Sequence, residues 1–287
     1  MAILDQIVQD ESSPELSHGH SRRIRVLLVI TGLAVGGVTN VVLDIARHLK
    51  DNPGFDIELL TGPPPPGRTD VTEIAYQLGI KTRVIPSLIN NLNPVTNLRA
   101  VAKIRKIIMD GRYDVIHTHS SVAGVVGRLA ALAAGSPVIL HHVHGWPPYQ
   151  SMRPGMRMLY LALERVCATF TTRIITVSGA DINKGLAYGI CRAEKFCLIY
   201  NGIDLNKFRQ SADQSPIREQ LRIDPHHKLV GMVGRLDQQK NPLDFIRAAA
   251  IVAKSYSDVQ FLMIGANLSR VQAHWAHLWK CLMAQLV

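Results

Sequence analysis

The chain has 287 residues, of which 47% are apolar and 19% are charged. That length fits two domains or one large domain, and that composition excludes an intrinsically disordered or acidic-tail protein. Lys and Arg number 32 against 22 for Asp and Glu, which gives a formal net charge of +10. Such a balance favours an anionic partner: a nucleic acid, an anionic lipid or a phosphorylated metabolite.

Targeting and redox signals are sparse in this sequence. The 4 cysteines form no Cys-x-x-Cys pair, so a disulfide framework or zinc ribbon has little support and a reducing cytosol is expected. The longest apolar run, 26–38, is shorter than the ~18–20 residues that span a bilayer. Residues 1–21 carry acids and no basic segment, which argues against a signal peptide and predicts a mobile arm. We therefore expect a cytoplasmic protein.

From residue 22 onward, short β-branched runs alternate with segments of helical period. The expected strands are 24–30, 56–61, 81–85, 114–118, 138–143 and 173–177. The expected helices are a segment with apolar residues at 42, 45, 46 and 49, followed by 74–78, 94–109, 122–134 and 156–170. Because right-handed crossovers place a helix after each strand, the alternation predicts a parallel sheet covered on both faces. We expect a doubly wound α/β domain, Rossmann-like, over residues 22–195.

A second set of elements begins near Phe196. Strands are expected at 196–200, 229–233 and 259–264, and a helix at 242–253. Asn241 as N-cap and Pro242 at the first helical position mark the start of that helix. Two or three strands cannot bury both faces of a parallel sheet. The sequence therefore predicts a partial second domain over 196–265, followed by an atypical tail over 266–287.

A glycine-rich turn follows the first expected strand and contains Gly36 and Gly37. Glycines at a strand-to-helix turn let backbone N–H groups approach a phosphate, and the helix N-terminus adds partial positive charge. The alternative is a tight turn that needs positive φ. The spacing is not Gly-x-Gly-x-x-Gly, and Glu58 lies inside its strand rather than at the end, where it would contact a ribose. Phosphate binding is therefore better supported than dinucleotide binding.

Histidines crowd two expected strand ends, at 117, 119, 141, 142 and 144. Strand alternation places His117 with His119 on one face, and His142 with His144 on one face. A metal cluster is one interpretation, although neither run contains Asp or Glu. A polar group near a reacting centre is favoured instead, with His144 best placed because it precedes the 145–148 loop. Satisfied core histidines are the alternative, which fits His117 and His141 better.

Arg235 and Lys240 bracket the start of the second-domain helix after a strand that ends in Val233-Gly234. A guanidinium fork and a lysine point charge at a helix N-terminus together form a diphosphate clamp. A solvated charge pair is the alternative.

Two further segments combine cations with apolar residues, at 99–112 and 152–165. Each could touch an anionic lipid surface, although the solvated outer face of a sheet-covering helix is the simpler interpretation.

At this point the sequence resembles the glycosyltransferases of family 4. The matching pieces come in family order over residues 22–265: Gly36-Gly37, Asp114-Val-Ile-His-Thr-His119, Val143-His144-Gly145, Ile175-Thr-Val-Ser178, Tyr200-Asn-Gly-Ile-Asp204 with Phe208, Val233-Gly-Arg235 with Lys240, and Phe261-Leu-Met-Ile-Gly265. Each piece alone is unspecific, but the ordered set is a strong indication.

The resemblance implies a GT-B fold of two facing Rossmann-like domains. It also implies transfer of a sugar from a nucleotide-diphosphate sugar to a lipid-linked or polysaccharide-precursor acceptor, with retention of configuration. Arg235 and Lys240 match the pair that holds the donor diphosphate, Gly36 and Gly37 match the loop that faces the donor phosphates, and His144 matches the histidine beside the transferred sugar.

No metal and no cofactor are expected, because members of the family need none. The expected partners are the nucleotide-sugar donor and, by peripheral contact at the inner face, an anionic membrane. Nucleic acid is not an expected partner.

Three features depart from the family pattern. Residues 38–40 read Val-Thr-Asn where many relatives have Ala-Glu-Arg, the Glu-x7-Glu segment has no counterpart, and Ala266-Asn267-Leu268 replaces the second glycine-rich loop. The sequence therefore predicts a C-terminally truncated or frameshifted chain with an incomplete donor domain, whose activity is in question. A non-catalytic remnant that acts only as a binding module is the alternative, and the glycine spacing disfavours a third hypothesis, a Rossmann oxidoreductase.

Overall fold

The computed structural model of the chain describes residues 22–206, 216–236 and 240–265. The predicted arm over 1–21, the predicted tail over 266–287 and Phe208 lie outside the described residues. The chain divides into two compact units, Met1–Gly202 and Ile203–Val287.

The first unit is built on a seven-stranded parallel sheet with the order β3-β2-β1-β4-β5-β6-β7. Its strands are β1 (Ile24–Ile30), β2 (Phe55–Thr61), β3 (Lys81–Val84), β4 (Val115–His119), β5 (Val138–Val143), β6 (Arg173–Thr176) and β7 (Phe196–Leu198). The last five residues of β1 and of β2 are all buried, as a sheet covered on both faces requires.

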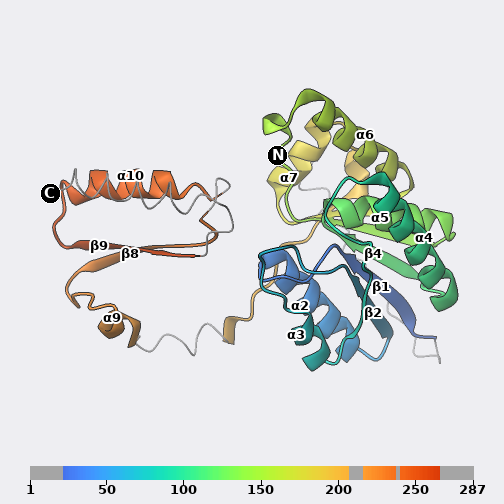
Figure 1. The fold of residues 1–287 in the computed structure, drawn as a ribbon, viewed down its shortest axis with the longest axis horizontal. Coiled ribbons are helices and arrows are strands. Elements are labelled where there is room, and N and C mark those ends of the chain that lie inside the picture. Colours follow the sequence, from blue (N-terminus) through green and yellow to red (C-terminus); the bar gives the residue numbers. More distant parts are fainter. Residues whose placement is uncertain (1–21, 207–215, 237–239, 266–287) are drawn as a thin grey trace. The chain divides into compact units, whose positions relative to one another are not determined.

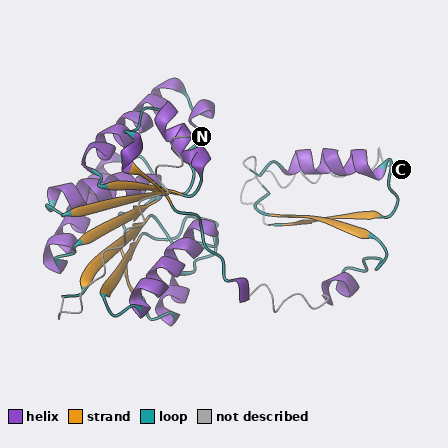
Figure 2. Ribbon diagram, turned by 180° about the vertical axis from the view of Figure 1, so that it is seen from behind, coloured by secondary structure: helices purple, strands orange, loops and turns teal. Residues whose placement is uncertain are grey.

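Helices cover this sheet on both sides (Figures 1 and 2). They are α2 (Gly37–Asp51), α3 (Thr72–Gln77), α4 (Pro94–Gly111), α5 (Ser121–Ala133), α6 (Pro154–Phe170) and α7 (Gly179–Ala187), with short 3-10 turns at η1 (Tyr149–Ser151) and η2 (Ala193–Lys195). One core cluster joins Leu27, Val29 and Ile116 to α4 and α5, and another joins Val26, Leu28 and Ile30 to α2 and α3. Alternate residues of each strand thus supply opposite faces, and the predicted α/β fold is confirmed.

The strand expected to open the second domain belongs to the first sheet. Phe196 pairs with Ile174 on β6, and its side chain is buried in a cluster with Ile182 and Ile190. The sequence pattern places residue 196 at the start of the second set of elements, because β-α alternation alone does not say which sheet a strand joins. The structure places these residues in the first unit, which extends to Gly202.

The described part of the second unit is a βαβ arrangement, as predicted. It contains α9 (Pro216–Gln220), β8 (Lys228–Val233), α10 (Pro242–Ala253) and β9 (Val259–Ile264), and β8 pairs with β9 in parallel. Asn241 is the N-cap residue of α10, as predicted, but it adopts a left-handed conformation and its side chain bonds to Asp244 instead of to the backbone of the first turn. Among the described residues from 203 onward, only Pro242 is buried.

Candidate functional site

The strand order places a topological switch point between β1 and β4. From β1 the chain moves outward to β2 and β3, then returns to the other side of β1 at β4. In open parallel sheets, ligands bind beyond the carboxyl ends of the strands at such a reversal. The glycine-rich turn follows β1, and the predicted histidines end β4 and β5, so both features lie at this edge.

A strained residue, Ser120, joins the loops that follow β1 and β4. Its hydroxyl is hydrogen-bonded to the hydroxyl of Thr31, and its carbonyl accepts from the N–H of Gly124 at 2.8 Å. Ser120 has φ 64° and ψ 164°, a region that non-glycine residues rarely occupy. Such backbone strain costs about 1–3 kcal/mol and gathers at functional sites. The sequence gives no signal for this residue, since nothing about a serine predicts positive φ.

Gly36 and Gly37 begin helix α2 in an extended and then helical backbone. Gly36 has φ 160°, close to the extended conformation that any residue adopts, and Gly37 is not among the positive-φ glycines of the described chain. A Cβ added at Gly37 would meet nothing within 4 Å, and one at Gly36 only the carbonyl oxygen of Ala34 at 3.9 Å. Neither a tight turn nor packing within the first unit therefore requires these glycines. The surface above them is open to an approaching ligand.

Four histidines share one face of the sheet. His119 on β4 is in register with His142 on β5, and in a parallel pair such residues point to the same face. The ring centroids of His117 and His119 lie 4.3 Å apart, and those of His142 and His144 lie 4.2 Å apart. The alternation predicted from the sequence is confirmed, and the register brings both pairs together. Their proximity across two strands was not predicted.

His141 points to the opposite face, toward α5. Its Nδ1 is 3.0 Å from the hydroxyl oxygen of Thr118, and a Cβ at Gly124 would collide with its ring. The interpretation as a satisfied core histidine is therefore right for His141. It is wrong for His117, which is buried but whose Nε2 has no hydrogen-bond partner among the described residues.

Burial keeps all five imidazoles neutral. It lowers the pKa of His117 to about 3, of His142 to about 4 and of His144 to about 3, with neighbouring histidines adding to the effect at His117 and His144. The pKa values of His119 and His141 are lowered in the same way, again chiefly by burial. At neutral pH these rings can accept and donate hydrogen bonds or bind a metal, but they supply no positive charge.

His144 is fixed by its neighbours on both sides. Its Nε2 is 3.0 Å from Nδ1 of His119, so one of the two nitrogens carries the shared proton. The next residue, Gly145, has φ 113°, which a side chain would strain. Trp146 then anchors the loop by donating its indole N–H to the carbonyl of Asp181 at 2.7 Å. His144 is half-buried and lies at the ligand-binding edge.

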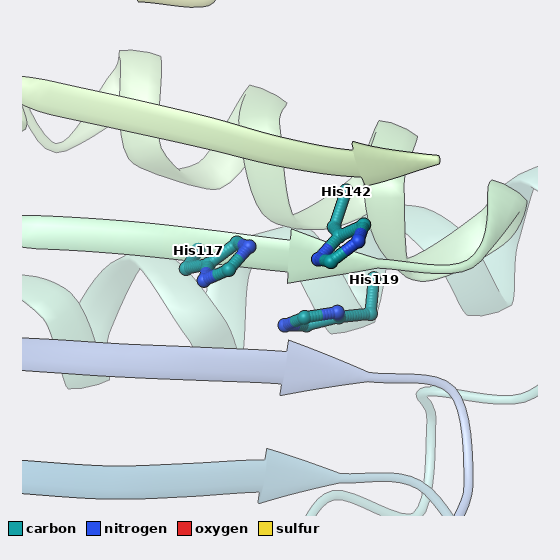
Figure 3. A group of neighbouring side chains, drawn as sticks. All are labelled: His117, His119 and His142. Atoms are coloured by element: carbon teal, nitrogen blue, oxygen red, sulfur yellow. The ribbon is translucent and has the colours of Figure 1, made fainter. Parts of the chain in front are cut away.

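One metal-competent group occurs in the described part of the chain. One ring nitrogen each of His117, His119 and His142 lies within 4.8 Å of those of the other two (Figure 3).

Glu58 is committed to the fold. Its carboxylate is 3% exposed and bonds to Lys81 at 2.7 Å, to Arg83 at 2.5 Å and to the hydroxyl of Tyr113 at 2.8 Å. Because its carboxylate is buried and already bound to these three partners, Glu58 is not a candidate for contact with a ribose.

Arg235 and Lys240 both lie at the carboxyl end of β8. Arg235 is half-buried two residues after the strand, and Lys240 is exposed two residues before α10. The aliphatic stem of Lys240 packs near Gly234, because a Cβ at Gly234 would be 3.7 Å from its Cγ. Residues 237–239, the middle of the predicted clamp, lie outside the described residues. Gly36, Gly37 and His144 belong to the first unit, and the two cations belong to the second.

A surface depression of about 300 Å³ lies elsewhere, near the end of α6. Two of its cations are already used: Arg165 donates to the carbonyl of Tyr188, and Lys195 donates to the carbonyls of Ala168, Thr169 and Thr171. The bonds of Lys195 cap the end of α6, and those of Arg165 satisfy the carbonyl of the residue that caps α7, so the depression is a poor candidate for an anion site.

These observations define a Rossmann-like α/β protein with a ligand-binding edge at the β1/β4 switch point. Comparison with protein-family models identifies the family to which this chain belongs. The model of Glycosyltransferase Family 4 matches residues 35–207, and the chain belongs to this family. The predicted resemblance is therefore confirmed.

Similar proteins agree with this assignment. The UDP-Gal:alpha-D-GlcNAc-diphosphoundecaprenol alpha-1,3-galactosyltransferase of Escherichia coli is 31% identical over 234 residues, which cover 80% of this chain and 59% of that protein. The D-inositol 3-phosphate glycosyltransferase of Thermobispora bispora is 26% identical, over 80% of this chain and 56% of that protein. The chain thus spans somewhat under three fifths of the length of these two relatives.

A crystal structure of Anabaena HepE in complex with UDP has the same fold. Its TM-score is 0.71 at 24% identity, covering 92% of this chain and 66% of that chain. The GT-B-like fold class is confirmed by this likeness. Both relatives are named as glycosyltransferases. Retention of configuration and C-terminal truncation stay predictions.

Membrane-spanning helices were also sought. Within 22–206, 216–236 and 240–265, no helix is both long and apolar enough to cross a bilayer.

Proposed function

We propose that the protein transfers a sugar from a UDP-sugar to a lipid-linked saccharide acceptor, with retention of anomeric configuration. The observation that carries this proposal is the 31% identity over 80% of the chain to a transferase named for UDP-Gal and a diphosphoundecaprenol-linked acceptor. The UDP complex of the structurally similar HepE supports the choice of base. The surface of the first unit is compatible with it, since the switch-point edge has open glycines at a helix start.

Arg235 and Lys240 are proposed to bind the diphosphate of the donor. For the first unit, the proposal is that the start of α2 at Gly36 and Gly37 offers backbone N–H groups to donor phosphates. Sugar transfer leaves negative charge on the nucleoside diphosphate, and fixed cations and N–H dipoles stabilise that charge. The transfer then needs no metal ion.

His144 is proposed to lie beside the transferred sugar. Its imidazole is neutral, because burial lowers its pKa to about 3. A neutral ring adds no positive charge beside the sugar, and the ring nitrogen that does not contact His119, Nδ1, can form a hydrogen bond with a sugar hydroxyl. Its hydrogen bond with His119 holds the ring in one orientation.

Nucleotide binding tests the donor part of the proposal. Calorimetric titration of UDP into the full chain should give saturable binding, weakened about tenfold or more in Arg235→Ala and Lys240→Ala, because hydrogen bonds to charged groups contribute about 1.5–3 kcal/mol each. Arg247→Ala is the matched control, since this exposed arginine of α10 pairs with Asp244. Equal UDP affinity in all four proteins would refute the diphosphate assignment.

Turnover tests the catalytic part separately. With a labelled UDP-sugar and a polyprenyl-diphosphate-linked acceptor, the parent chain should form product and His144→Ala should form much less while still binding UDP. A chain that binds UDP but transfers nothing to any such acceptor would refute transfer and leave donor binding standing.

The start of α6 is proposed to contact the membrane that holds the acceptor. Met158 is 69% exposed and Leu159 47% exposed, and Arg153 and Arg157 lie on the same segment. Apolar side chains beside cations suit the surface of an anionic bilayer. Sedimentation with phosphatidylglycerol vesicles should be reduced in Met158→Ser and unchanged in Ile251→Ser, whose parent side chain on α10 is also 69% exposed. Equal reduction by both variants would contradict a specific contact by α6.

A further inference from the structure

We propose that His117, His119 and His142 form a binding site for a divalent transition-metal ion of the zinc class. The three rings gather at the carboxyl ends of β4 and β5 (Figure 3). From the sequence alone, a polar group near a reacting centre is favoured over a metal cluster at these histidines, because neither run contains an acidic residue. The structure supplies what the sequence lacked: a third ring brought across from the neighbouring strand by the register of His119 with His142.

The spacing of the rings is close to that of a metal site. The ligand nitrogens of the three residues all lie within 4.8 Å of one another, and the ring centroids are 4.3 to 5.7 Å apart. Nitrogens bound to zinc lie about 2.0–2.1 Å from the metal, so in a tetrahedral site they are about 3.3 Å apart. The 4.8 Å limit exceeds this separation by about 1.5 Å, so the proposal requires the rings to turn toward one another when the ion binds.

The unpartnered nitrogens are the second, independent observation. Nε2 of His117, Nε2 of His119 and both ring nitrogens of His142 are buried with no hydrogen-bond partner among the described residues. The three residues are 7%, 0% and 4% exposed. A buried polar atom without a partner costs about 1–3 kcal/mol, so four of them in one place favour a bound group that the protein itself does not supply. Coordination of a cation satisfies three of these atoms at once.

The chemistry of the donor set selects the ion. Three neutral imidazoles suit zinc, cobalt, nickel and copper, whereas magnesium and calcium prefer oxygen ligands. Burial keeps the imidazoles deprotonated, which is the form that binds metal. Three protein ligands leave a fourth position for water or another group.

His144 acts as the outer partner of this site. It contacts Nδ1 of His119 at 3.0 Å, which leaves Nε2 of His119 as the nitrogen available for the metal. Coordination through Nε2 fixes the proton on Nδ1, so His119 then donates to His144. Partners of this kind commonly orient metal-binding histidines.

Metal titration of the full chain tests the proposal without reference to turnover. After metal is removed with a chelator, Zn²⁺ is titrated by calorimetry and Co²⁺ by its visible absorption, and one equivalent of each should bind. Mg²⁺ in the same titration should not compete. Bound Zn²⁺ should also raise the melting temperature, because the ion binds the folded chain.

Variants locate the bound ion. His142→Ala and His117→Gln should each weaken Zn²⁺ binding about tenfold or more. His117→Gln keeps a polar side chain, so it tests the proposal even if His142→Ala does not fold. The matched control is His18→Ala with His20→Ala, which removes another His-x-His pair of the sequence and should retain the bound equivalent. Absence of Zn²⁺ binding by the parent chain, or unchanged binding in a folded His142→Ala or His117→Gln variant, would overturn the proposal and leave buried water to satisfy these nitrogens.

Discussion

At the residue scale, a buried ion pair joins α5 to α6. Arg128 is fully buried, its Nη2 donates to Glu164 at 2.7 Å, and its Nε donates to the carbonyl of Gly124 at 2.8 Å. Arg128→Met leaves the Glu164 carboxylate buried without its cation, so the free energy of unfolding should fall by about 3–5 kcal/mol. Urea denaturation of the parent and the variant measures this loss.

The double variant Arg128→Met with Glu164→Leu is the control for that prediction. It removes both charges and leaves an apolar contact, which often restores the stability lost by breaking a buried pair. If the single and the double variant were equally unstable, the loss would come from packing around Arg128 rather than from the stranded carboxylate.

Two glycines that follow β1, Gly32 and Gly37, give a second prediction. A Cβ at Gly37 meets nothing within 4 Å, whereas one at Gly32 would lie 2.8 Å from the carbonyl oxygen of Pro63. Gly37→Ala should therefore leave the free energy of unfolding unchanged or raise it by up to about 0.5–1 kcal/mol, so the melting temperature should not fall. Under the proposed function, the same variant should bind UDP more weakly. Gly32→Ala should lower the melting temperature. Unchanged UDP affinity in Gly37→Ala would exclude a close phosphate contact there.

The sequence indicates the candidate site only in part, and particular residues show why. Gly36, Gly37 and His144 can be predicted from the sequence because each stands in the loop or turn that follows a strand pattern. Ser120 cannot be predicted in this way, since its positive φ accompanies a contact with Thr31, which lies in another loop, after β1. The grouping of His117, His119 and His142 depends on the register between β4 and β5, which no local pattern encodes.

At the element scale, a charged cluster links β2 to β3. Burial alone raises the pKa of Glu58, but hydrogen bonds from Lys81, Tyr113 and Arg83 outweigh it and hold the pKa below its usual value of 4.5. Because the folded-state pKa is lower than the unfolded-state one, the carboxylate contributes its full stability above pH 4.5 and loses it as pH falls through the folded-state pKa.

Glu58→Gln isolates this contribution. The difference in unfolding free energy between parent and variant should be constant above about pH 5 and should shrink as the pH is lowered further. Urea denaturation at a series of pH values measures the difference. A difference that grew on acidification would mean that Glu58 has a raised pKa and that burial, not its three partners, dominates.

Elements with strong local patterns were predicted closely. The strands Ile24–Ile30, Val138–Val143 and Val259–Ile264 and the helix Pro242–Ala253 have the predicted bounds, since β-branched runs and an N-terminal proline mark them. Helix α7 was not predicted, because the short segment Gly179–Ala187 contains two glycines. Its start depends on Ser178, which accepts from the N–H of Asp181.

At the scale of the whole molecule, the two units differ in how much they bury. The first unit has extended core clusters on both faces of its sheet, whereas among the described residues from 203 onward only Pro242 is buried. An amide hydrogen exchanges with solvent slowly when a large part of the structure must open together to expose it. Burial of apolar groups makes opening cooperative in this way.

Hydrogen exchange should therefore separate the units. Amides of β1 and β4 should exchange only with global unfolding of the first unit, while those of β8 and β9, whose residues are at most half-buried, should exchange much sooner. Mass spectrometry of peptic fragments at several labelling times resolves the two classes, and saturating UDP should slow exchange in β8 if the nucleotide binds beside it. Equal protection of β4 and β8 without UDP would mean that the second unit has a core as cooperative as the first.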